Sequence, residues 1–126
     1  MQDAHPFAVH FREDNPHSVE RQGVYEQALA LTASIDQLVE KSEARFHLKD
    51  LLDKSATMIA LRIAQAAGET GKSERRRQYR MARRAATDCA AILDILSRRV
   101  ADAALIAPAR TLVIALVSQL AHLATK

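Results

Sequence analysis

Apolar residues recur along most of this chain in alternating steps of four and three, the spacing of one face of an α-helix. The first such series begins after Ser18, a candidate N-cap, and ends near Ser42. The pattern predicts an amphipathic helix of roughly 22 residues. Its inward-facing members are Val24, Ala28, Leu31, Ile35 and Leu38.

A second series starts near Glu43 and keeps the same spacing as far as Ala66. Gly68 follows as a candidate C-cap, and Gly71 completes the turn. The apolar seam of this second helix is predicted to contain Leu48, Leu52, Ser55, Ile59, Arg62 and Ala66.

Two further helices complete the pattern. Ser73 is the candidate N-cap of the third, which is predicted to continue to about Ala103. Pro108 stands where the first residue of a fourth helix is often a proline. No segment alternates with the period of a strand. The pattern therefore predicts an all-α fold, an antiparallel up-down four-helix bundle.

The chain is predicted to be a single domain of residues 18–126, preceded by a loose N-terminal arm, residues 1–17. The arm contains Pro6, Pro16 and three histidines among mixed charges, a composition typical of extended chain. Of the 126 residues, 48% are hydrophobic and only 4% aromatic. A chain of this length can bury a core, and its Ala and Leu favour helices.

Composition also bears on the compartment. A single cysteine, Cys89, excludes an internal disulfide and suits a reducing cytosol. The first residues contain Asp3, Glu13 and Asp14 but no apolar segment of the signal-peptide kind. Charges interrupt the apolar stretches before they reach membrane-spanning length. We expect a cytoplasmic protein with no membrane partner.

Positive charge is concentrated at the start of the third helix. Seven of the 18 Lys and Arg residues lie between residues 72 and 84, against one acid, Glu74. At about 100° per residue they fall on one broad arc of the helix, opposite an apolar arc. The net charge is only +3, so this basic character is local. The seven residues are Lys72, Arg75, Arg76, Arg77, Arg80, Arg83 and Arg84.

We expect this basic face to bind the backbone of RNA or DNA, because the forked guanidinium of arginine matches phosphate oxygens. Tyr79 is the only aromatic residue nearby, so phosphate contact rather than base stacking is expected. Such binding is salt-sensitive and weakly sequence-selective. Two alternatives remain open: an ordinary solvated helix surface, and docking of an acidic protein or a neighbouring subunit.

Residues 66–73 read AAGETGKS, a relaxed form of the phosphate-loop pattern. A phosphate loop needs a strand that enters it and a parallel sheet around it. Residues 58–64 instead continue a helical seam, and Ala66 replaces the first glycine of the pattern. A helix–turn–helix connection is favoured, with nucleotide binding as the minor alternative.

Arg62 stands in the predicted seam of the second helix, where a free guanidinium would be unfavourable to bury. We expect a structural polar pair with Asp88, at the edge of the apolar face of the third helix. A partner across a subunit interface and a guanidinium that reaches solvent are the alternatives.

Candidates for catalysis or metal binding are lacking. The five histidines match no metal-site spacing, and the chain contains no Glu-x-x-His pair. Cys89 lies on the predicted core side of the third helix and is interpreted as a small buried residue. We expect no enzyme activity, no metal and no cofactor.

Residues 51–96 resemble the bacterial four-helix-bundle family whose genes were first noticed inside large-subunit rRNA intervening sequences. The family pattern is Ser-Ile, two residues, Asn-Ile-Ala-Glu-Gly, a turn, and later Ile-Ala-x-Gly-Ser-x-x-Glu. Residues 58–66, MIALRIAQA, align with the first part, and residues 81–88, MARRAATD, with the second. The pattern positions that differ include those of Arg62, Gln65, Ala66, Arg84 and Asp88.

The resemblance implies a small non-enzymatic bundle that assembles into a ring-shaped homo-oligomer, typically a pentamer. A similar protein, the accessory variability protein of diversity-generating retroelements, uses a basic pentamer to engage nucleic acid and a reverse transcriptase. The predicted fourth helix also favours association, because its apolar residues cover more of its circumference than one core needs. These residues are Leu105, Ile106, Val113, Ile114, Val117 and Leu120.

Overall fold

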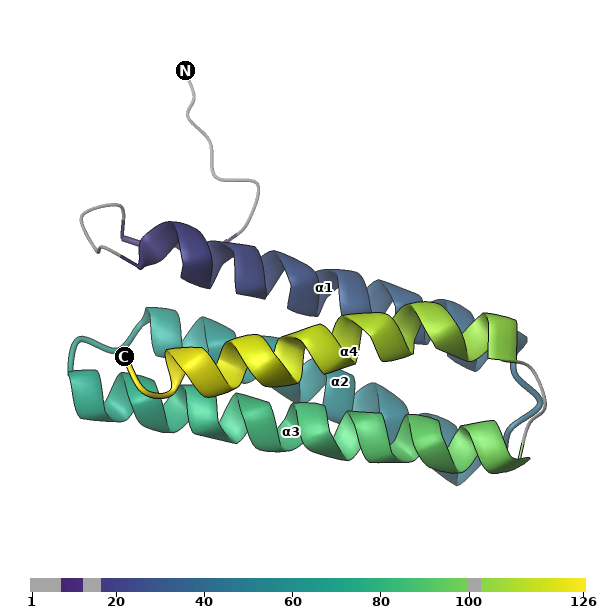
Figure 1. Ribbon diagram of the computed structural model, residues 1–126. Coiled ribbons are helices and arrows are strands. Elements are labelled where there is room, and N and C mark those ends of the chain that lie inside the picture. The colour runs from purple at the N-terminus through teal and green to yellow at the C-terminus, as the bar shows by residue number, and fades with distance from the viewer. Residues whose placement is uncertain (1–7, 13–16, 100–102) are drawn as a thin grey trace, which may run out of the picture.

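The structure is a computed structural model that describes residues 8–12, 17–99 and 103–126. In these ranges it contains four α-helices and no strand. The helices lie side by side as an elongated bundle (Figure 1). They are α1, Ser18–Lys41; α2, Phe46–Ala67; α3, Lys72–Arg99; and α4, Ala103–Leu123.

The helices are arranged in a ring. α1 packs on α2 and α4, and α3 packs on the same two helices. In the described part of the chain, no Cα atoms of the diagonal pairs α1–α3 and α2–α4 lie within 8 Å of each other. Each helix runs opposite to the one before it (Figure 1). The predicted up-down four-helix bundle is therefore confirmed.

The core follows most of the predicted periodicity. The five apolar positions predicted for α1 are all buried. In α2 the seam is as predicted up to Ile59, after which Ile63 takes the core position and Arg62 lies half-buried beside it. Both residues are one turn from Ile59, and the apolar side chain is the one that enters the core. The prediction of Arg62 as a seam residue was wrong.

The connection between α1 and α2 is longer than predicted, since α2 begins at Phe46 instead of Glu43. Ser42 has an extended backbone and donates its N–H to the Leu38 carbonyl, 2.8 Å away. Its hydroxyl accepts the N–H of Ala44 at 3.0 Å. This local bond gives the backbone an alternative to the helix, which delays the start of α2.

Pro108 lies inside α4, which begins five residues earlier, at Ala103. The prediction that Pro108 opens the fourth helix was wrong. Proline removes one helical hydrogen bond, here the bond to the Ala104 carbonyl. Ala104 and Pro108 are both exposed, so water can satisfy that carbonyl.

α4 is long and apolar enough, by length and composition, to cross a membrane, with a mean hydropathy of 1.7. Arg110 does not prevent this, so the expectation that charges interrupt every apolar stretch was wrong here. The structure packs one side of α4 between α1 and α3, and only 28% of the apolar window is buried. The outer side of α4 is mixed: Ile114 is 52% exposed, beside the exposed polar residues Arg110, Thr111, Ser118 and His122. Localisation stays a prediction.

Most of the predicted arm lies outside the described residues. Within the described part, Phe11 is buried and packs on Tyr25 of α1, with ring centroids 5.6 Å apart. This contact attaches residues 8–12 to the beginning of α1. Helical periodicity carries no signal for it, because Phe11 precedes the helix.

Candidate nucleic-acid interface

α3 is a continuous helix of 28 residues with strongly divided faces. Glu74 lies in its first turn and Arg98 and Arg99 in its last, the placement that complements the helix dipole. One face is buried against α2 and α4. The buried residues are Gln78, Tyr79, Ala82, Ala86, Cys89, Leu93 and Leu96.

Six of the seven predicted cationic residues lie away from the buried side, and we call them the arginine face. Arg76 is half-buried, and the other five are exposed. Arg77 lies 3.9 Å from Glu74, in a pair that is more than half exposed. In the described residues no carboxylate lies within 4 Å of the other five cations. The arginine face comprises Lys72, Arg76, Arg77, Arg80, Arg83 and Arg84.

The spacing of these cations is unfavourable in isolation. Arg76, Arg80 and Arg84 follow one another at intervals of four residues, so their charges face each other along the helix. Each such like-charge pair destabilises a helix by about 0.2–0.5 kcal/mol. A polyanion lying along α3 would remove this repulsion.

Arg75 departs from the arginine face. It is half-buried with a buried Nε that has no hydrogen-bond partner, as is Arg76, but it lies on the side of α3 that contains the buried residues. It lines a small cavity at the end of the bundle together with Arg21 of α1. The signal for this was present in the sequence, because Arg75 precedes the buried Gln78 and Tyr79 by three and four residues.

Arg62 does not pair with Asp88 in the described structure. Its Nη1 donates to Oε1 of Gln65 at 3.0 Å and to Oε1 of Gln78 at 3.4 Å. The short turn between α2 and α3 sets the register of the two antiparallel helices, which places Arg62 opposite Gln78. Asp88 is exposed further along α3, where it borders a groove with Leu51. The expected Arg62–Asp88 pair was therefore wrong.

The AAGETGKS segment forms a helix–turn–helix connection. Ala66 and Ala67 end α2, and Lys72 begins α3. Gly68 has a φ of −85°, so the turn does not use the left-handed freedom of glycine. Within the described ranges no strand enters this segment, so the structural context of a phosphate loop is missing.

Cys89 is buried as predicted. Burial raises the pKa of its thiol, and a hydrogen bond with Ser55 acts in the opposite direction. A protonated, enclosed thiol is a poor nucleophile. Among the described residues, no group of three or more His, Cys, Asp and Glu is placed to hold a metal ion.

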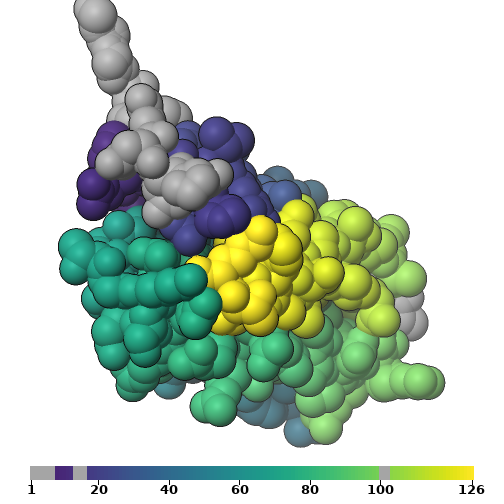
Figure 2. Space-filling model, turned by 60° about the vertical axis from the view of Figure 1, so that its left-hand side comes forward, coloured from purple at the N-terminus to yellow at the C-terminus, as the bar shows by residue number. Residues whose placement is uncertain are grey.

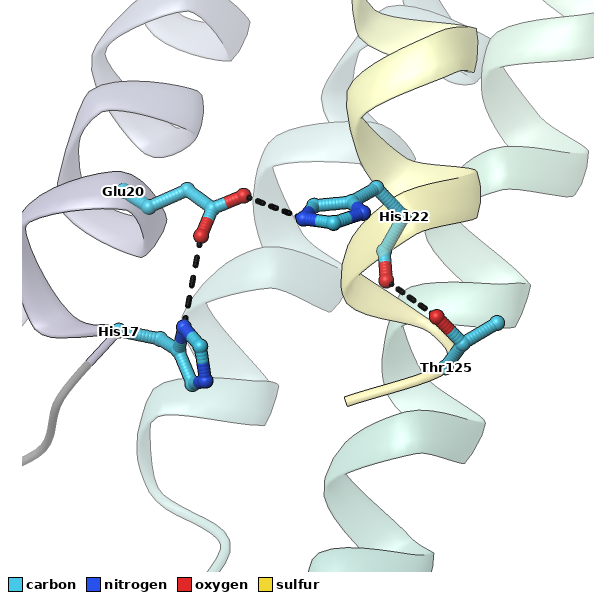
Figure 3. Close-up of polar contacts among 4 residues, drawn as sticks. All are labelled: His17, Glu20, His122 and Thr125. Atoms are coloured by element: carbon cyan, nitrogen blue, oxygen red, sulfur yellow. Dashed lines mark hydrogen bonds and ion pairs between the residues drawn. The ribbon is translucent and has the colours of Figure 1, made fainter.

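A polar cluster that the sequence did not reveal joins the start of α1 to the end of α4 (Figure 3). Glu20 contacts Nδ1 of His17 at 3.5 Å and Nε2 of His122 at 3.3 Å. Thr125 donates its hydroxyl to the His122 carbonyl at 2.8 Å. The partners are about a hundred residues apart in the chain, so no local pattern could predict them.

Comparison with protein-family models, curated proteins and solved structures finds no match for this chain. The resemblance to the intervening-sequence bundle family therefore stays a prediction. The predictions of self-association and of nucleic-acid binding are supported by the residues of this chain alone.

Proposed function

We propose that this protein is a non-enzymatic, homo-oligomeric bundle that binds the phosphate backbone of RNA or DNA through the arginine face of α3. One observation carries the proposal: five cations on one rigid helix have no carboxylate partner in the described residues. At a rise of 1.5 Å per residue, residues 72–84 extend over about 18 Å. This length matches about five phosphates of one strand.

Backbone contact is favoured over base recognition. Tyr79, the aromatic residue within this stretch of α3, is fully buried and cannot stack on a base. Guanidinium groups that meet phosphate oxygens fix position but carry no sequence information. We therefore expect binding that depends strongly on salt and weakly on sequence.

Self-association would strengthen this binding. Of the residues predicted to support association, Ile106, Val113 and Leu120 are buried in the bundle itself, whereas Ile114 is 52% exposed and Val117 is half-buried. Ile114 and Val117 would supply the apolar surface for a contact between subunits. A closed ring, with five subunits as the leading expectation, would repeat the arginine face and multiply its phosphate contacts.

The test is a charge reversal at three arginines. We expect Arg76→Glu, Arg80→Glu and Arg83→Glu together to weaken binding of labelled RNA and DNA by more than about 100-fold, because three phosphate contacts are lost. A matched control reverses Lys41, Arg45 and Lys54, which are exposed and lie outside α3. Both triple variants change the net charge equally, so only a local site separates them.

Circular dichroism and light scattering check that helicity and oligomer size persist in both variants. Equal loss of binding in the two variants would mean that net charge alone accounts for the effect, which would contradict the proposal. Binding of an acidic protein, with no affinity for nucleic acid, would assign the arginine face to protein docking instead.

A further inference from the structure

A small cavity lies at the end of the bundle where α1 begins and α2 turns into α3. Figure 2 brings this end forward, with the start of α1 in purple, the α2–α3 turn in teal and the C-terminus in yellow. Arg21 of α1 and Arg75 of α3 line the cavity, and Ala66 and Thr70 of the AAGETGKS segment form part of its wall. The cavity has a volume of about 50 Å³.

Arg21 is the exceptional residue of this cavity. It is only 4% exposed, and its Nε is buried without a hydrogen-bond partner. Burial, and then the nearby charge of Arg75, lower the pKa of Arg21, while Tyr79 and Glu20 act in the opposite direction. An arginine nevertheless stays protonated in proteins. The cavity therefore contains a buried positive charge, which is unfavourable without an anion.

The acids nearby do not neutralise this charge. In the described residues neither Arg21 nor Arg75 has a carboxylate within 4 Å. Glu20 adjoins Arg21 in sequence, but its carboxylate is held between His17 and His122 (Figure 3). Glu69 borders the cavity without forming an ion pair with either arginine.

A buried hydroxyl lies close enough to the two arginines to be affected by their charge. Tyr79 is fully buried and its hydroxyl has no hydrogen-bond partner. Burial raises the pKa of Tyr79 to about 12, while the charges of Arg21 and Arg75 act to lower it, so the hydroxyl keeps its proton at neutral pH. Two arginines from two helices thus line the cavity, and no described carboxylate lies within 4 Å of either.

We propose that this cavity binds one phosphoryl group, as inorganic phosphate or as the terminal phosphate of a larger molecule, through Arg21 and Arg75. The guanidinium fork matches two oxygens of a phosphate. One water molecule needs about 10–15 Å³ of cavity volume, so this cavity has room for about four groups of that size. A phosphate has four oxygens and therefore fits. The cavity has no room for a sugar or a base, which would remain outside.

This proposal does not depend on nucleic-acid binding by the arginine face. Arg75 lies on the other side of α3 from Arg80 and Arg84, and Arg21 belongs to a different helix. The AAGETGKS segment contributes a turn that closes one wall, without acting as a phosphate loop.

The first experiment titrates the full chain with inorganic phosphate, using thermal melting and calorimetry against sodium chloride of equal ionic strength. We expect a melting temperature that rises with phosphate and saturates, because the ligand binds only the folded state. Arg21→Gln should weaken phosphate binding by about 30-fold or more, since a buried charged partner is removed. Arg80→Gln, the same change on the arginine face, should leave phosphate affinity unaltered.

Two results would overturn the proposal. One is a melting temperature that responds to phosphate no more than to chloride, and the other is an Arg21→Gln variant that binds phosphate as the parent does. If Arg21→Gln does not fold, Arg75→Gln at the half-buried position serves as the second variant, with a loss of phosphate affinity expected. The triple reversal of the arginine face should still bind phosphate, which separates this site from the proposed function.

A second experiment distinguishes the sources of the phosphoryl group. Single-stranded oligonucleotides with a 5′-phosphate or a 5′-hydroxyl are compared on the parent chain and on Arg21→Gln. Tighter binding of the phosphorylated strand, lost in Arg21→Gln, assigns the cavity to a terminal phosphate. Equal binding of both strands, with phosphate affinity intact, assigns it to the free ion.

Discussion

Arg75 and Arg76 are neighbours in the first turns of α3, yet they belong to two different regions of charge. Both are half-buried, with a buried Nε that has no hydrogen-bond partner. Arg76 belongs to the arginine face, whose other cations are exposed, whereas Arg75 lines the end cavity with Arg21. One step of the helix thus divides a single basic segment into an extended electrostatic surface and a confined anion site.

The two regions should respond differently to their surroundings. Exposed charges are screened over about 8–10 Å at physiological salt, so the arginine face acts through many weak contacts. Enclosed charges are screened much less and act on one group at a time. Salt, pH and single substitutions can therefore separate the two regions.

The largest expected effect is on the salt dependence of nucleic-acid binding. With about five phosphate contacts, affinity should fall about 500-fold between about 50 mM and about 200 mM salt. Arg80→Gln with Arg83→Gln should lower the slope of log K against log salt by about 2, because two contacts are removed. Fluorescence anisotropy measures both. If Arg21→Gln changed the slope as much, the two regions would not be distinct.

The next effect is alkaline destabilisation through Tyr79. Its pKa is about 12 in the fold and 10.0 as the reference value, so the folded state retains a proton that the unfolded chain loses. The free energy of unfolding should therefore be unaffected below about pH 10 and fall by about 2–3 kcal/mol as the pH rises to about 12.

Urea unfolding across this pH range compares the parent with Tyr79→Phe. The variant should lack this component of the pH dependence, and at neutral pH it should be equally or more stable, because a buried unpaired hydroxyl is removed. An identical alkaline profile in both proteins would contradict the enclosure of Tyr79 beside Arg21.

A smaller effect is expected when a buried arginine and an exposed arginine are each replaced by methionine. Arg21→Met should raise the free energy of unfolding by about 1–3 kcal/mol in phosphate-free buffer, because a buried unpaired charge is replaced by an apolar chain of similar length. Arg80→Met should change it by less than about 0.5 kcal/mol, as expected for a solvated position. Destabilisation by Arg21→Met would show that its guanidinium is already satisfied.

The smallest effect concerns the cluster that holds Glu20 away from the cavity. Glu20→Gln should lower the free energy of unfolding by less than about 1 kcal/mol, because the contacts with His17 and His122 are partly exposed. Asp94→Asn, which weakens the exposed Asp94–Arg110 pair, provides a control of similar size. A loss above about 2 kcal/mol would mean that Glu20 also compensates Arg21.

Helical periodicity was enough to predict the fold, because burial along each helix depends on residues one turn apart. Helical periodicity failed for contacts that depend on how two helices pack against each other. The partner of Arg62 depends on the register of α2 against α3, which places Gln78 rather than Asp88 beside it. The end cavity joins residues from α1 and α3 that no local pattern connects. The arginine face was accessible to the sequence because it lies on one helix.

The position of Arg21 and Arg75 on diagonal helices has a mechanical consequence. The Cα atoms of α1 and α3 do not approach within 8 Å anywhere in the described ranges, so these two helices are not directly adjacent in the bundle. An anion bound by both arginines would link α1 to α3 at this end of the bundle. Its arrival would stiffen that end of the bundle, and amide hydrogen exchange there would slow while the opposite end kept its rate.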